Sequence, residues 1–166
     1  MDLRNVTGLI LSAELGAFDA EQNALRSAKM VHSLLAVAKF DAAVIPLNGS
    51  WEGKEEHSYL VAPMKTVIND PVKYQDFLYS IIAIASEFSQ AAVLSMYEGT
   101  VHLIEIPSVA WNLSREDRIA ALKEIMLEDG GRTLLSDSME IRKVDEDYAK
   151  LYEGYTELDG VYYVVS

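Results

Sequence analysis

Hydrophobic and polar positions repeat along the chain with a helical period in two long stretches. The first stretch predicts a helix over 20–38, with Asp19 as its N-cap and Gln22 in the reciprocal capping position. The second predicts a helix over 71–89, because Asp70-Pro71 combines a cap with proline at the first helical position. The first helix is expected to face the core with Ala24, Leu25, Ala28, Val31, Leu34, Leu35 and Ala38.

Short runs of apolar and β-branched residues predict strands around these helices, and Glu98-Gly99 predicts a tight turn between two of them. The expected strands begin near Leu9 and cover 42–47, 58–62, 91–97 and 101–106. The resulting order over residues 1–106, β-α-β-β-α-β-β, is typical of a split β-α-β, ferredoxin-like sandwich with an added strand. Its core would lie between an antiparallel sheet and two amphipathic helices.

The remaining third, residues 107–166, is expected to extend the same domain with a helix and a hairpin. Ser114 predicts the start of a helix that runs to Glu128 and is closed by Gly130-Gly131. Residues 132–150 are polar and mixed and predict no element. Alternating aromatic and β-branched residues over 155–165 predict a hairpin that turns at Asp159-Gly160.

Composition excludes several classes of protein. The 166 residues carry a net charge of −12, which argues against binding to nucleic acid or to an anionic membrane, although it permits a DNA mimic. There is no cysteine, so disulfides and thiol chemistry are excluded. No signal peptide is recognised, and the longest apolar run, 81–85, is too short to cross a membrane, so a cytoplasmic protein is expected.

The strongest candidate for chemistry is an acidic stretch over 49–61, GSWEGKEEHSYLV, which places Glu52, Glu55 and Glu56 between two expected strands. One interpretation is a solvated acidic hairpin loop, because most charge clusters face solvent. The other is a binding site, because aromatic residues accompany the carboxylates and both groups stabilise a positive charge. No metal site is expected, since His32, His57 and His102 lack ligand spacing.

Three segments of the chain resemble the small phage S-adenosylmethionine lyases, long called S-adenosylmethionine hydrolases. The likeness covers about residues 9–106. It is carried by Asn23, Arg26, Met30 and Val31, by Gly49, Trp51, Glu55-Glu56, Ser58 and Val61, and by Glu87-Phe88, Gln90, Val93-Leu94 and Tyr97. The chain departs from the family pattern at Trp51, where a tyrosine is usual, and in a shorter loop before the acidic pair. Tyr59 is the candidate to replace that hydroxyl.

The resemblance implies a ferredoxin-like fold and a lyase that splits S-adenosylmethionine into methylthioadenosine and homoserine lactone. No cofactor or metal is implied, and the enzyme would deplete the methyl donor of host restriction and methylation. It also implies a homo-oligomer, with a trimer expected, whose sites lie between subunits. Glu56 is the expected catalytic residue, with Glu55 as the alternative. The expected substrate-binding residues are Trp51, Ser58, Tyr59, Gln90 and Tyr97.

Two other functions stay open at this point. A non-enzymatic acidic phage protein could inhibit a host enzyme or mimic DNA, which the charge of −12 favours. A small-ligand sponge could instead bind an adenine nucleotide without turnover.

Overall fold

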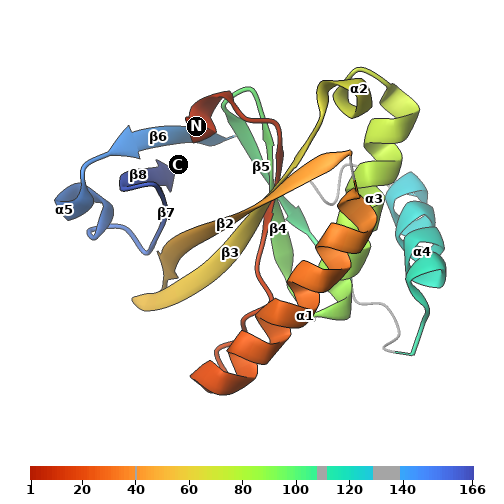
Figure 1. The fold of residues 1–166 in the computed structure, drawn as a ribbon, viewed down its shortest axis with the longest axis horizontal. Helices are drawn as coiled ribbons and strands as arrows, with labels where there is room; N and C mark the ends of the chain where they lie inside the picture. The colour runs from red at the N-terminus through yellow and green to blue at the C-terminus, as the bar shows by residue number, and fades with distance from the viewer. Residues whose placement is uncertain (40, 108–111, 129–138) are drawn as a thin grey trace.

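Eight antiparallel strands close into a barrel in the order β1-β3-β2-β7-β8-β6-β5-β4 (Figure 1). A computed structural model describes residues 1–39, 41–107, 112–128 and 139–166, and the side chains of 126–128 lie outside that description. The strands are β1 (Gly8–Leu11), β2 (Ala42–Trp51), β3 (Lys54–Pro63), β4 (Ala92–Tyr97), β5 (Thr100–Glu105), β6 (Met139–Val144), β7 (Gly154–Leu158) and β8 (Val161–Val165). The helices are η1 (Leu3–Asn5), α1 (Ala20–Ala38), α2 (Lys65–Ile68), α3 (Pro71–Glu87), α4 (Arg115–Glu128) and α5 (Glu146–Ala149).

The ferredoxin-like fold class predicted from the sequence is wrong. The element order over residues 8–105 is as expected, apart from the added α2, and the strands there pair antiparallel. The C-terminal strands, however, pair with both edges of that sheet: β7 with β2, and β6 with β5. An open sandwich has two free edges, whereas this sheet has none, so the architecture is a closed barrel.

Three hairpins of the barrel use the same two-residue turn. Glu52-Gly53, Glu98-Gly99 and Asp159-Gly160 each adopt positive φ at both positions. Two successive positive φ values define the turn whose twist matches that of paired strands, and an acidic residue followed by glycine suits it. The turns expected at Glu98-Gly99 and Asp159-Gly160 are thereby confirmed.

Apolar side chains form two separate cores, one on each side of the sheet. The first lies between the barrel and α1, α3 and α4, and includes Leu9, Met30 and Ile81. The second fills the barrel interior and includes Leu47, Leu60 and Tyr163. Figure 1 shows the long helices on one side of β1 and the strands β6–β8 on the other.

The predicted bounds of α1 and its capping box are confirmed, but its buried face is only partly as predicted. Leu34 and Ala38 are buried as expected, whereas Leu25 and Leu35 are 60% and 56% exposed. Met30 and Ser27 are buried instead. Apolar residues occur on more than one side of this helix, so their spacing does not select which side the barrel covers.

The last third of the chain contains two elements that the sequence did not predict, β6 and α5, both within the polar stretch 132–150. The helix start at Ser114 is confirmed, since the Ser114 hydroxyl accepts from the amide of Asp117 at 3.1 Å. The expected closure at Gly130-Gly131 lies outside the described residues. Among the helices that the structure describes, none is long and apolar enough to cross a membrane.

Candidate functional site

The acidic stretch is a continuous hairpin rather than a loop between two short strands. β2 and β3 pair over ten residues each, from Ala42–Pro63 to Trp51–Lys54. The three glutamates therefore occupy three different places: Glu52 lies in the turn, and Glu55 and Glu56 lie on β3. Because side chains alternate along a strand, Glu55 and Glu56 point to opposite faces of the sheet.

Glu56 belongs to the face that lines the barrel interior. It pairs with Gly49, and the same face of these strands carries the buried Leu47 and Leu60. The Glu56 side chain is partly buried and lies near Ser12, the residue that follows β1. Burial raises the pKa of the Glu56 carboxyl, the Glu14 carboxylate raises it further, and interaction with the Ser12 hydroxyl opposes both effects. A partly dry position with two neighbouring carboxylates would favour a cation.

This pKa gives a prediction for stability, tested with Glu56→Gln. Between the ordinary value of 4.5 and the raised value, the folded chain keeps a proton that the unfolded chain has lost. The contribution of Glu56 to stability therefore falls as the pH rises through that window. We expect Glu56→Gln to gain stability relative to the wild type between pH 4 and pH 7, measured as urea midpoints. A relative loss of stability over that range would contradict the assignment.

The chain that leaves β1, the Ser12–Leu15 segment, is held by side chains from other parts of the sequence. The Arg26 Nε donates to the Ala13 carbonyl at 2.7 Å. The Gln90 Nε2 donates to the Glu14 carbonyl at 3.2 Å. Asn23 accepts from the Leu15 amide at 2.9 Å and donates to the Leu15 carbonyl at 3.1 Å. The backbone of an irregular segment is thus satisfied by side chains of α1 and by Gln90, which follows α3.

The same segment also contacts β3. The Ser12 hydroxyl donates to the carbonyl of His57 at 2.9 Å and accepts from the Glu14 amide at 3.1 Å. The Glu14 carboxylate lies 2.8 Å from Nδ1 of His57, and its side chain is 17% exposed. Glu14 therefore stands at the barrel rim, in contact with one face of β3 through His57 and close to Glu56 on the other.

Arg26 is the central anchor of this arrangement. Its guanidinium stacks near the rings of Phe18 and Phe88 and also donates to the Phe88 carbonyl. Burial lowers the pKa of Arg26. Its N–H groups are satisfied by the carbonyls of Ala13 and Phe88.

We expect Arg26→Met to destabilise the fold by about 1–3 kcal/mol, because two carbonyls lose their donor. Thermal unfolding of this variant beside Lys29→Met, an exposed position on the same helix, provides the measurement. Equal melting temperatures would show that the anchor contributes nothing.

The structure brings some of the predicted site residues together and separates others. Ser58 shares the face of Glu56. Trp51 also lies on that face, two residues nearer the turn, and is 56% exposed. Gln90 reaches Glu14, as described above. Tyr59 packs into the helix-side core, on the opposite face. Tyr97 follows Met96, which pairs with the first residue of β1, so it lies at the far end of that strand from Ser12.

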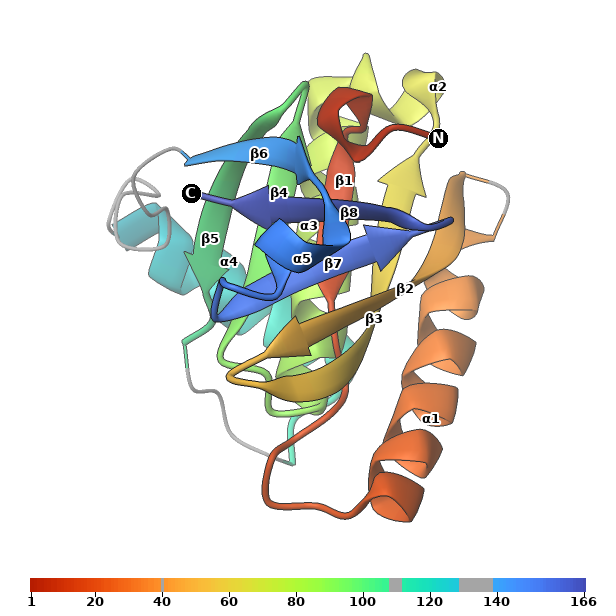
Figure 2. The ribbon, with the colours of Figure 1, turned by 90° about the vertical axis from the view of Figure 1, so that its left-hand side faces the viewer.

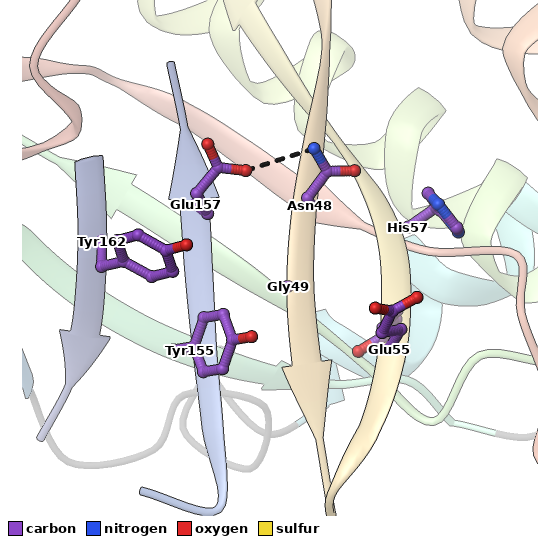
Figure 3. A pocket seen from close by; sticks show the side chains of 8 residues that line it. Asn48, Gly49, Glu55, His57, Tyr155, Glu157 and Tyr162 are labelled. Atoms are coloured by element: carbon purple, nitrogen blue, oxygen red, sulfur yellow. Dashed lines mark hydrogen bonds between the residues drawn. The ribbon is translucent and has the colours of Figure 1, made fainter. Parts of the chain in front are cut away.

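A shallow groove of about 210 Å³ lies on the outer face of the hairpin, where Glu55 and His57 point (Figure 3). Gly49 and Glu56 also line this groove, and its other walls were not predicted from the sequence: Asn48, Tyr155, Glu157 and Tyr162. Alternation within the 155–165 hairpin could have placed Tyr155 and Glu157 on one face, but nothing local indicates that β7 pairs with β2. Ser12 and Glu14 were also missed, since a strand end alone does not mark a site.

Comparisons with known proteins add no family. The chain matches no protein-family model and no curated protein. Within the part of the chain that the structure describes, no group of three or more His, Asp or Glu side chains could hold a metal ion.

Proposed function

We propose that this protein is an S-adenosylmethionine lyase with Glu56 as its key residue. The observation that carries the proposal is the meeting of three separate segments at one place. Asn23 and Arg26 from the first, Glu56 from the second and Gln90 from the third all contact or adjoin the Ser12–Leu15 segment. These are the segments on which the resemblance to the lyases depends.

The resemblance implies a ferredoxin-like fold, whereas the chain forms a closed barrel. The proposal therefore depends on the site residues and not on the architecture. The hydrogen bonds around the Ser12–Leu15 segment would also serve a turn with no catalytic role. What favours a site is the partly buried Glu56, whose neighbours include a second carboxylate that raises the cost of its charge.

The chemistry needed from the protein is mainly orientation. In the proposed reaction, a substrate carboxylate oxygen attacks the γ-carbon of the methionine arm, and the carbon–sulfur bond breaks with its electron pair going to sulfur. The sulfonium becomes the thioether of methylthioadenosine, and the ring that closes is homoserine lactone. Glu56, with Glu14 beside it, would bind the substrate α-ammonium group and so direct the attacking carboxylate. Orientation of this kind can supply ~7–11 kcal/mol of the barrier.

The direct test is to incubate the purified protein with S-adenosylmethionine and to follow methylthioadenosine and homoserine lactone by mass spectrometry. Formation of both products in equal amounts is expected. Binding measured by calorimetry without either product would instead support the ligand sponge, and neither binding nor product would refute the proposal.

The proposal includes self-association, with a trimer expected. The exposed Leu25 and Leu35 on α1 support it, because they leave apolar area on one helix for a second copy to cover. Light scattering on the assayed sample gives the oligomeric state, and a fully active monomer at micromolar concentration would remove an interfacial site from the proposal.

A further inference from the structure

The outer face of β3, β2, β7 and β8 carries a polar and aromatic surface that the proposed lyase reaction does not use. Cross-strand pairing fixes its members. Asn48 pairs with His57 on one side and with Glu157 on the other, and Glu157 pairs with Tyr162. Paired residues point to the same face, so one row of side chains crosses four strands.

A second row lies beside the first. Ser50 pairs with Glu55 on β3 and with Tyr155 on β7. The rings of Tyr155 and Tyr162 are 5.5 Å apart at an angle of 54°. Figure 3 shows these side chains spread over neighbouring strands, with the carboxylates of Glu55 and Glu157 on either side of β2. We call this surface, formed by Asn48, Glu55, His57, Tyr155, Glu157 and Tyr162, the outer groove.

The outer groove is open to solvent. Its residues Asn48, Glu55 and His57 are exposed. In Figure 2 the helices α3 and α4 lie behind the strands, whereas α1 runs beside β2 and β3 and the short α5 lies against β8. Its space of about 210 Å³ is below the ~300–1,000 Å³ typical of pockets that enclose a small molecule. The shape therefore suits a side chain presented by a protein surface rather than an enclosed ligand.

The chemistry of the outer groove selects a positive charge. Carboxylates stand on two of its strands, and tyrosine rings add faces that attract cations. Each oxygen of Glu157 accepts one bond, from the Gly160 amide at 2.7 Å and from Asn48 at 3.2 Å, and these bonds fix the position of the carboxylate. A planar guanidinium can form two parallel hydrogen bonds to a carboxylate and lay its flat face on a tyrosine ring, a geometry that a compact ammonium does not provide.

We propose that the outer groove is a docking surface for a basic partner protein and receives an arginine side chain of that partner. The net charge of −12 supplies the complementary field that would bring a basic protein to this face. Tyrosine is enriched in protein interfaces, which agrees with the two rings. The side chains of the outer groove lie on the opposite face of β3 from that of Glu56. Glu56 nevertheless lines the same groove, and His57 contacts Glu14 of the proposed lyase site.

The test uses the full chain and a labelled eight-residue peptide that alternates arginine and serine, with binding followed by fluorescence anisotropy at physiological salt. The double variant Glu55→Gln/Glu157→Gln is compared with Glu105→Gln/Glu124→Gln, which removes the same charge from exposed positions elsewhere. We expect the groove variant to weaken binding by about 5- to 30-fold and the control by less than twofold.

Two further measurements keep the test decisive. Tyr155→Leu should weaken the arginine peptide more than a matched lysine peptide, and melting temperatures confirm that each variant is folded. Equal weakening by both double variants would overturn the proposal, because it would show attraction to the net charge alone. Free arginine binding as tightly as the peptide would also overturn it, in favour of a small-molecule site.

Discussion

Glu56→Gln should reduce methylthioadenosine release by roughly 30-fold to several thousand-fold while leaving the protein folded. Losing a charge that anchors the substrate ammonium in a partly dry site costs ~2–5 kcal/mol, and each ~1.4 kcal/mol is one decade in rate. The swap keeps size and shape, and at neutral pH it removes a carboxylate whose burial is unfavourable. Activity should therefore fall without a fall in melting temperature, and the two readouts separate a site from a structural role.

The same hairpin supplies the controls for this prediction. Glu52 is exposed in the turn, so Glu52→Gln should leave turnover within about twofold of the wild type, because surface changes cost little. Glu55 points to the outer face, so Glu55→Gln should cost less activity than Glu56→Gln. Equal losses in all three variants would mean that the stretch acts only through its total charge. Equal activity in all three variants would support the other interpretation of this stretch, a solvated acidic hairpin without a role in catalysis.

Gly49→Ala should produce the largest loss of stability among single changes in the hairpin. A Cβ at this position would lie 2.5 Å from the Tyr155 carbonyl oxygen, on the strand that closes the barrel. Backbone cannot give way as a flexible side chain can, so we expect a cost of ~1–3 kcal/mol. At ~2–4 °C per kcal/mol, the melting temperature should fall by roughly 2–12 °C.

Gly16→Ala is the matched control, because a Cβ there meets nothing within 4 Å. Its melting temperature should stay within about 1–2 °C of the wild type. If both variants melt alike, the close approach of β2 and β7 does not contribute to stability.

Local elements of this fold could be predicted from sequence because their signals are local. The Asp19 and Gln22 capping box and the Asp70-Pro71 start lie within one helical turn, and both helices begin where expected. The barrel could not be predicted because its closure depends on strands far apart in sequence. Nothing near Asn48 indicates that Glu157 will lie beside it.

Some residues of the candidate site could be predicted from the sequence, and others could not. A pattern of three segments indicated Glu56, Gln90 and Arg26, and the structure brings all three to the Ser12–Leu15 segment. Tyr59 is the candidate to replace the family's tyrosine hydroxyl, and Tyr97 closes the third segment of the resemblance. β alternation and strand length place both of them elsewhere. Glu14 carries no sequence signal, since its role depends on contacts with His57 on β3 and with Gln90, which follows α3.

The pairing of β2 with β7 has a consequence for how the chain is made. Trp51 pairs with Gly154, which is roughly a hundred residues further along the chain. At ~5–20 residues per second, the ribosome adds Gly154 about 5–20 s after Trp51. During that interval the edge of β2 over Asn48–Trp51 has no strand to pair with and could join a neighbouring nascent chain. Pro46, which has no amide hydrogen to donate, and the acidic residues that follow in β3 make such pairing unfavourable. We therefore expect the charges of this hairpin to disfavour pairing with other nascent chains until β7 is made.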